Sequence, residues 1–119
     1  MESNRQKKFG KLIQQEMSEL LPREMAVPDS PLLTVTVVRM TADMGIARVY
    51  ISVLPDQKGA ATIEFLNENK GEARYLLGKR IRKQVRHIPE LEFYLDDTLQ
   101  EVERMDDLFR QIQDDPDAK

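Results

Sequence analysis

The sequence of 119 residues predicts one α+β domain, in which a small sheet packs against helices. Two kinds of pattern point to this class. Apolar residues recur at helical spacing near both ends of the chain and in its third quarter, and two segments between them are rich in β-branched residues. The expected order is helix, strand, strand, kinked helix, strand and C-terminal helix. We expect residues 1–112 to form this single domain and the acidic residues 113–119 to be disordered.

The first helix is expected over residues 4–21. Ser3 and Gln6 have the spacing of a capping box, in which each side chain bonds the backbone of the other residue. An apolar helical stripe follows, made of Phe9, Leu12, Ile13, Met17, Leu20 and Leu21. Pro22 is expected to end the helix, and the three prolines within residues 22–31 predict a connector.

Two strands are expected, over residues 32–40 and 46–54. Both are rich in β-branched residues. In the second strand, alternate residues point to the same face of the sheet, and those on one face are all small or branched: Ala47, Val49, Ile51 and Val53. Residues 41–45 have the length of a hairpin loop, with Gly45 available for a positive φ. We therefore expect an antiparallel pair.

Residues 60–88 predict a long helical segment with a kink. The kink is expected at Asn69, Lys70 and Gly71, because a glycine inside a helix costs about 1 kcal/mol relative to alanine. Pro89 should end the segment, since proline disfavours helical geometry in the residue before it.

A third strand and a last helix complete the expected order. Alternation of apolar and polar residues over 91–95 predicts a short strand. Thr98 and Glu101 repeat the capping-box spacing. The amphipathic stripe that follows predicts a helix and comprises Leu99, Val102, Met105, Leu108, Phe109 and Ile112.

Residues 71–88 carry two stripes of opposite chemistry, both at helical spacing. The apolar stripe is Leu77, Ile81, Val85 and Ile88. The basic stripe is Lys79, Arg82, Lys83 and Arg86. At about 100° of rotation per residue the two stripes fall on nearly opposite faces, so one can pack on a core while the other meets solvent or a polyanion.

The charge of the chain is segregated along its length. The whole chain has 18 basic and 21 acidic residues, a net charge of -3, which by itself argues against a nucleic-acid partner. Residues 70–88, however, hold seven basic residues against one acidic, while residues 89–119 hold eleven acidic against three basic. Such segregation is informative about binding partners rather than about the fold.

Several classes of function are disfavoured by composition. The chain has no cysteine, and no apolar run is long enough to span a bilayer, so we expect a soluble cytoplasmic protein without a membrane partner. His87 is the sole histidine, and we expect it to be structural rather than catalytic. The pairs Asp96–Asp97, Asp106–Asp107 and Asp114–Asp115 are adjacent residues, which rarely face one ion together, so no metal or other cofactor is expected.

The order of elements and one long segment resemble the ribosome-binding factor A family. The segment is LLGKRIRKQVRHIPELEFYLDDTLQEVERMDDLF, residues 76–109, where a basic helix precedes the pattern Pro-Glu-Leu-x-Phe-x-x-Asp at residues 89–96. The predicted hairpin, with Asp43 in its loop, is similar as well. The resemblance covers about residues 3–112.

The resemblance implies a KH-like fold of type II and a role in assembling the small ribosomal subunit. Family members bind the immature particle of bacteria and its ribosomal RNA (rRNA), assist late rRNA maturation alongside other assembly factors, and have no catalytic activity. We therefore expect a monomeric assembly factor without the Gly-x-x-Gly loop of ordinary KH domains, which this chain also lacks. The family usually has an Ala-x-Gly kink, and here the matching residues are Asn69, Lys70 and Gly71.

The candidate RNA-binding residues form two groups. The first is Lys70, Arg74, Tyr75, Lys79, Arg82, Lys83 and Arg86, in which Tyr75 can stack on an unpaired base. The second is Arg5, Lys7, Lys8 and Lys11 on the first helix. The alternatives are a solvated helix face paired with the acidic last helix, a protein–protein module that docks on an acidic partner, and, remotely, a hydrolase that uses the aspartate pairs.

Overall fold

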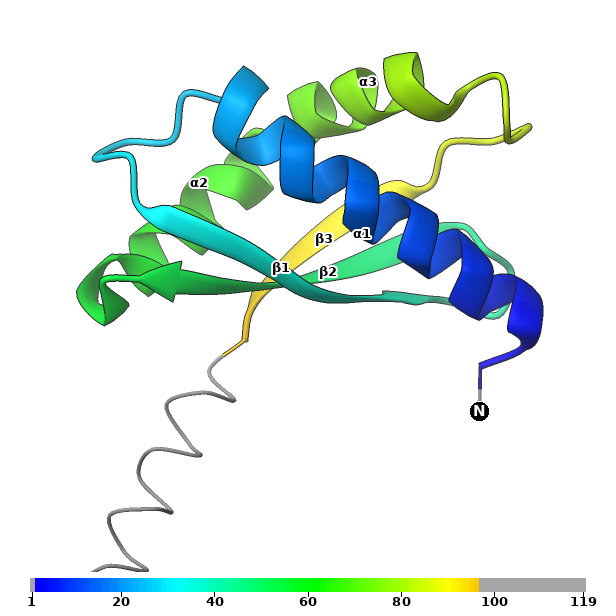
Figure 1. Ribbon diagram of the computed structural model, residues 1–119, viewed down its shortest axis with the longest axis horizontal. Helices are drawn as coiled ribbons and strands as arrows, with labels where there is room; N and C mark the ends of the chain where they lie inside the picture. The colour runs from blue at the N-terminus through cyan, green and yellow to red at the C-terminus, as the bar shows by residue number, and fades with distance from the viewer. Residues whose placement is uncertain (1, 97–119) are drawn as a thin grey trace, which may run out of the picture.

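The computed structural model describes residues 2–96 and shows two layers, with helices on one face of a three-stranded sheet (Figure 1). The helices are α1 (Asn4–Glu24), α2 (Gly59–Glu68) and α3 (Lys70–Ile81), with a short 3-10 helix, η1 (Asp56–Lys58), before α2. The strands are β1 (Leu32–Met40), β2 (Ile46–Leu54) and β3 (Glu90–Leu95). β1 and β2 are antiparallel, as predicted. β3 lies parallel to β2 on its other side, a pairing that the sequence did not predict. The α+β class and the KH-like order of elements are confirmed.

Part of the predicted fold lies outside the described residues. This holds for the helix at 98–112, for the tail at 113–119 and for the end of the domain at residue 112.

The core lies between the sheet and the helices. Every second residue of β2 is buried, and these are the four residues predicted to share one face. The largest fully buried side chains are Ile13, Met17, Leu20, Leu21, Val49, Ile51, Leu66, Leu77, Ile81, Leu91 and Phe93. Burying one large apolar side chain contributes about 1.5–3 kcal/mol, so the contact between helices and sheet is the main source of stability.

α1 begins with the predicted capping box but ends later than predicted. The Gln6 N–H donates to Ser3 Oγ at 3.1 Å, and the Ser3 N–H donates to Gln6 Oε1 at 2.7 Å. The helix runs through Pro22 to Glu24, so the predicted end at residue 21 is wrong. Proline suits helical φ, and its missing N–H and its crowding of the preceding turn affect only the end of the helix. The buried Leu21 holds that turn against the core.

α1 packs against the outer edge of β1 through the side chain of Gln14 and a close backbone approach at Gly10. A bulge separates Val35 from Val37 in β1. Gln14 Nε2 donates to the carbonyl oxygens of Val35 and Thr36, at 3.3 and 3.1 Å. The backbones approach so closely at Gly10 that an added Cβ would lie 2.6 Å from the carbonyl oxygen of Val38. Without side-chain bulk at this position, the helix can lie directly on the strand.

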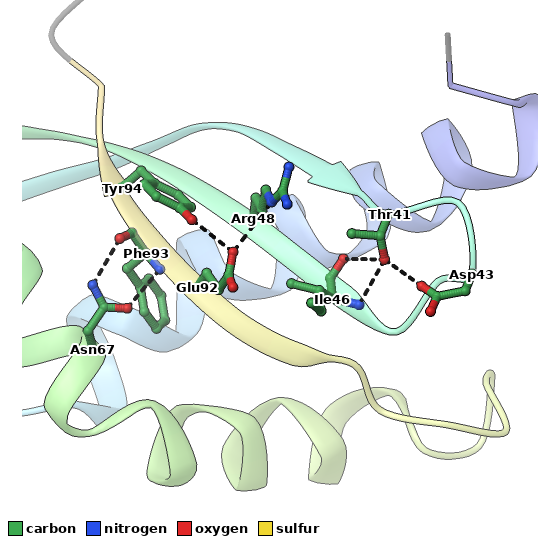
Figure 2. A network of polar contacts seen from close by, with 8 residues as sticks. All are labelled: Thr41, Asp43, Ile46, Arg48, Asn67, Glu92, Phe93 and Tyr94. Carbon is green, nitrogen blue, oxygen red and sulfur yellow. Dashed lines mark hydrogen bonds and ion pairs between the residues drawn. The ribbon is translucent and has the colours of Figure 1, made fainter.

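The opposite edge of the sheet, at β3, is closed by one amide side chain. Asn67 of α2 donates from Nδ2 to the Phe93 carbonyl oxygen at 2.9 Å and accepts from the Phe93 N–H at Oδ1 at 3.0 Å (Figure 2). The side chain thus satisfies backbone groups that a neighbouring strand would otherwise pair. Nothing in the local sequence pattern singled out Asn67.

The face of the sheet away from the helices carries an aromatic pair. Tyr50 and Tyr94 are register partners, and their rings stack with centroids 5.4 Å apart. The Tyr94 hydroxyl donates to Glu92 at 2.8 Å, and Glu92 also pairs with Arg48 at 3.4 Å (Figure 2). The hydrogen bond to the Glu92 carboxylate raises the pKa of Tyr94, so this hydroxyl stays a proton donor.

The hairpin between β1 and β2 uses a different residue for its positive φ than predicted. Met44 has φ of 64°, and Gly45 does not have a positive φ. Asp43 Oδ1 accepts from the Thr41 hydroxyl at 2.7 Å and from the Gly45 N–H at 3.0 Å. These bonds, led by the one from Thr41, lower the pKa of Asp43. The bond from the Gly45 N–H to the Asp43 side chain forms a tight turn with Met44 at its centre. Met44 adopts the left-handed conformation in this turn.

The helical segment after the hairpin breaks at Asn69, within the three residues that mark the kink. Asn69 has φ of -111° and ψ of 22°, so it belongs to neither helix. Its backbone N–H and its Nδ2 both donate to the Phe65 carbonyl oxygen, at 3.0 and 2.8 Å. Asn69 thus ends α2 and starts α3, while Gly71 lies inside α3 with no positive φ.

Gly71→Ala is expected to stabilise the protein. The position is helical, and an added Cβ would meet no atom within 4 Å. Alanine lowers the conformational entropy of the unfolded chain, so the free energy of unfolding should rise by about 0.5–1 kcal/mol. Urea unfolding followed by circular dichroism measures this change. A decrease would show that the kink needs the freedom of glycine.

α3 ends at Ile81, so its predicted continuation to Ile88 is wrong. Residues 82–84 form a turn instead. A helix through residue 88 would carry the chain about 10 Å further along the axis, at about 1.5 Å per residue. The chain turns back, and the Glu90 N–H donates to the Gly45 carbonyl oxygen at 2.9 Å, where β3 joins β2. The parallel pairing of β3 with β2 therefore requires the helix to end early.

The apolar stripe still packs on the core although its second half is not helical. Leu77 and Ile81 are fully buried, and Val85 and Ile88 are partly buried against the same core. The basic stripe, in contrast, is divided between α3 and the irregular segment after it.

Candidate nucleic-acid interface

A groove of about 540 Å³ lies between α3 and the segment that follows it. We call it the α3 groove; its lining residues are Gly71, Arg74, Tyr75, Gly78, Lys79, Arg82, Arg86, His87 and Ile88. Five of the predicted RNA-binding residues meet here, namely Arg74, Tyr75, Lys79, Arg82 and Arg86. The early end of α3 creates the groove, because the returning chain forms its second wall.

One of these arginines holds the second wall in place. Arg74 Nη2 donates to the Ile88 carbonyl oxygen at 2.8 Å, and its Nε lies 3.2 Å from the carbonyl oxygens of Ile88 and Pro89. The Ile88 side chain packs on Gly78, where an added Cβ would be 3.3 Å from Ile88 Cγ1. Arg74 thus has a positioning role in the groove, which its place in the sequence did not indicate.

Arg80 is the second arginine whose charge is used within the fold. Its guanidinium lies 3.1 Å from carboxylate oxygens of Glu16, Glu19 and Glu24 on α1. The hydrogen bond to Glu16, followed by the one to Glu19, raises the pKa of Arg80. These contacts tie α3 to α1 and direct Arg80 away from the α3 groove.

The remaining basic residues of this region are exposed. Within residues 2–96, the ion pairs of the structure do not include Lys79, Arg82, Lys83 or Arg86. Lys79 Nζ lies 5.5 Å from the centroid of the Tyr75 ring, a cation–π contact. Lys83 and Lys70 are exposed beside the groove but do not line it.

A second groove, of about 870 Å³, adjoins the first at Arg86 and His87. We call it the hairpin groove; its lining residues are Arg5, Phe9, Ala42, Asp43, Met44, Gly45, Gln84, Val85, Arg86 and His87. Arg5 of the α1 cluster is thereby placed in one surface with Arg86, although some 80 residues separate them. His87 is exposed and lines both grooves where they meet. The sequence did not suggest this position, because His87 precedes Ile88 of the apolar stripe.

The other basic residues of α1 do not join this surface. Lys7, Lys11 and Gln14 follow each other at helical spacing, so they share one side of α1. Gln14 bonds the β1 edge, and Lys11 lines a separate hollow with it, so this side is turned away from Arg5 and the 84–87 segment. Lys8 is exposed and lines neither groove.

The two grooves differ in charge. The pKa of Asp43 is lowered, so the hairpin groove keeps a negative charge at neutral pH. The α3 groove has no carboxylate among its lining residues. A phosphate is therefore attracted most strongly to the α3 groove and to the Arg86 end of the hairpin groove.

Other functional signals of the described part of the chain are few. Among residues 2–96, no group of three or more His, Asp or Glu side chains could hold a metal ion. No described helix is long and apolar enough to cross a membrane. Asp96 accepts a hydrogen bond from the Thr36 hydroxyl, and the other members of the aspartate pairs lie outside the described residues.

The sequence of this chain and its fold are both similar to those of ribosome-binding factor A proteins. The family model for ribosome-binding factor A matches residues 5–109. A ribosome-binding factor A from Chlorobium luteolum is 40% identical over 114 residues, which span 95% of each chain.

The fold is similar to solved structures as well. The crystal structure of ribosome-binding factor A from Thermus thermophilus superposes with a TM-score of 0.64 at 22% identity, over 76% of this chain and 93% of that one. A homology model of a Thermus thermophilus ribosome-binding factor A, fitted into the cryo-EM map of a 30S complex, gives a TM-score of 0.59 at 25% identity. It covers 74% of this chain and 91% of that one.

Proposed function

The chain belongs to the ribosome-binding factor A family, and we propose that it binds immature small ribosomal subunits and assists late maturation of their rRNA. It is an assembly factor of ribosome biogenesis and not an enzyme. The 30S complex of the Thermus relative supports the small subunit as partner. We expect the protein to act as a cytoplasmic monomer together with other assembly factors.

The proposed contact with rRNA is the α3 groove and its border. The observation that carries this proposal is that some basic side chains are bound within the protein while others are exposed. Arg74 and Arg80 are bound to groups of the protein itself, whereas Arg82 and Arg86 are exposed at the groove. Like charges that line one groove repel each other, so this arrangement favours the binding of an anion.

The proposed interface contains five cations: Arg5, Lys79, Arg82, Lys83 and Arg86. Lys7 and Lys11 are left out because they lie on the other side of α1. Basic side chains of this kind bind RNA phosphates with release of counterions, which supplies affinity without reading sequence. Because the whole chain has a net charge of -3, this local basic surface would also orient the protein on the RNA.

Salt dependence tests the number of phosphate contacts. If the five cations each neutralise one phosphate, log K should fall with log salt with a slope of about -4. The measurement is binding of the full-length protein to purified immature small subunits over a series of KCl concentrations. A slope near zero would contradict a phosphate-binding interface.

An acidic protein partner would also give a salt-dependent affinity, so a second measurement separates the two. Crosslinking of the bound protein to small-subunit precursors identifies the partner of the basic surface. Crosslinks from residues 79–87 to rRNA support the proposal. Crosslinks from the same residues to ribosomal proteins alone favour the protein–protein alternative.

A further inference from the structure

Tyr75 is the most exposed large apolar side chain of the described residues. It is 66% exposed and lines the α3 groove. An aromatic ring in water, surrounded by cations, contributes little to folding. Its position is that of a contact surface for a flat ligand.

Gly71 keeps the space on one side of the ring open, whereas Ile88 packs on Gly78. Gly71 and Gly78 lie one helical turn before and after Tyr75, on the same side of α3. An added Cβ at Gly71 would have no atom within 4 Å, the tyrosine ring included. The side chain of a helical residue leans toward the preceding turn, which for Tyr75 is the turn of Gly71. This turn therefore has no side-chain bulk beside the ring at Gly71.

Several cations line the α3 groove together with the ring. Lys79 Nζ lies 5.5 Å from the Tyr75 ring centroid, and an added Cβ at Gly71 would not touch the ring. Arg82 and Arg86 line the same groove. An open aromatic face next to cations matches the two parts of a nucleotide, a flat base and a phosphate.

We propose that the α3 groove binds an unpaired nucleotide of single-stranded RNA, with its base stacked on Tyr75 over Gly71 and its phosphates on Arg82 and Arg86. This inference rests on the proposed rRNA contact and specifies its ligand. The groove volume of about 540 Å³ suits a small ligand. A duplex has no free base face to offer, because its bases are stacked on each other.

The test compares three RNA ligands with full-length variants. The ligands are a short single strand, the same strand with one abasic nucleotide, and its duplex. Tyr75→Leu should weaken binding of the single strand by about 5- to 100-fold, while Tyr75→Phe keeps the affinity. For the abasic strand, Tyr75→Leu should cause a smaller loss, since the base that stacks is already absent. Duplex binding should be unchanged.

Gly71→Leu provides an independent test of the open space beside the ring. The backbone there tolerates a side chain, so the fold is kept while the groove is filled. We expect the same loss of single-strand affinity as for Tyr75→Leu. Ala61→Leu, on the exposed surface of α2, adds the same bulk outside the groove and should have no effect.

The outcomes separate this inference from the proposed function. If Arg82→Gln with Arg86→Gln weakens RNA binding but Tyr75→Leu and Gly71→Leu do not, base stacking is refuted and the phosphate contact stands. If none of these variants weakens binding, both proposals fail. An equal effect of Tyr75→Leu on duplex and single strand would also overturn the inference.

Discussion

The variant with Arg82→Glu and Arg86→Glu is expected to lose association with immature small ribosomal subunits while keeping its fold. Both guanidinium groups are exposed at the α3 groove, so replacing them removes no contact that holds the core. Hydrogen bonds that involve a charged group are worth about 1.5–3 kcal/mol each, so loss of two should weaken binding by about 100-fold or more. The new carboxylates add repulsion of phosphate.

Co-sedimentation of tagged full-length protein with purified precursors in a sucrose gradient measures this loss. The matched control is Lys7→Glu with Lys11→Glu, which changes the net charge by the same amount on the other side of α1. We expect the control to co-sediment nearly as the unchanged protein does. Circular dichroism should confirm the fold of both variants, because a carboxylate near the C-terminus of α3 is mildly unfavourable with the helix dipole.

Unchanged co-sedimentation of the Arg82 and Arg86 variant would remove the α3 groove from the interface. Equal losses in the variant and in the control would instead point to a general effect of net charge. Only a loss confined to the groove variant supports the proposed site.

Gly10→Ala is expected to destabilise the protein by about 2 kcal/mol. An added Cβ would lie 2.6 Å from the Val38 carbonyl oxygen, and neither of the two packed backbones can move without opening the contact of α1 with β1. Overpacking of an interior typically costs about 1–3 kcal/mol. The upper end of this range applies because a backbone atom is in the way, and the better helix propensity of alanine offsets about 1 kcal/mol of it, which leaves a net loss of about 2 kcal/mol.

Thermal unfolding of the two alanine variants gives a direct comparison. For a domain of this size a loss of about 2 kcal/mol lowers the melting temperature by about 10 °C. Gly71→Ala is the same substitution in another helix and should raise it. If Gly10→Ala leaves the melting temperature unchanged or raises it, the close approach at Gly10 does not determine how α1 packs on β1.

Local patterns predicted most of the fold correctly because each depends on neighbours in sequence. Alternation in β2 predicted its buried face, and the spacing of Ser3 and Gln6 predicted the capping box. The error at the end of α3 occurred because a distant segment decides the local geometry: this end is set by the joining of β3 to β2. The error in the hairpin is a local one, since the positive φ at Met44 rather than Gly45 depends on the turn made by the neighbouring Asp43.

The sequence predicted where the candidate site lies but not which of its basic residues are bound within the protein and which are exposed. The density of charge over residues 70–88 located it, because a run of like charges is visible without a structure. Arg74 and Arg80 have the same chemistry in the sequence as Arg82 and Arg86. Their partners are backbone carbonyls of the returning chain and glutamates of α1, which no local spacing reveals.

The sequence by itself determined the α+β class, the order of elements, the apolar faces and the position of the basic segment. Periodicity and composition are properties of neighbouring residues, and they are sufficient for these features. Only the tertiary structure decided which cations are free, which glycine is indispensable and that a groove opens beside Tyr75. Each of these depends on how close two remote parts of the chain come, and that distance is set by packing of the whole core.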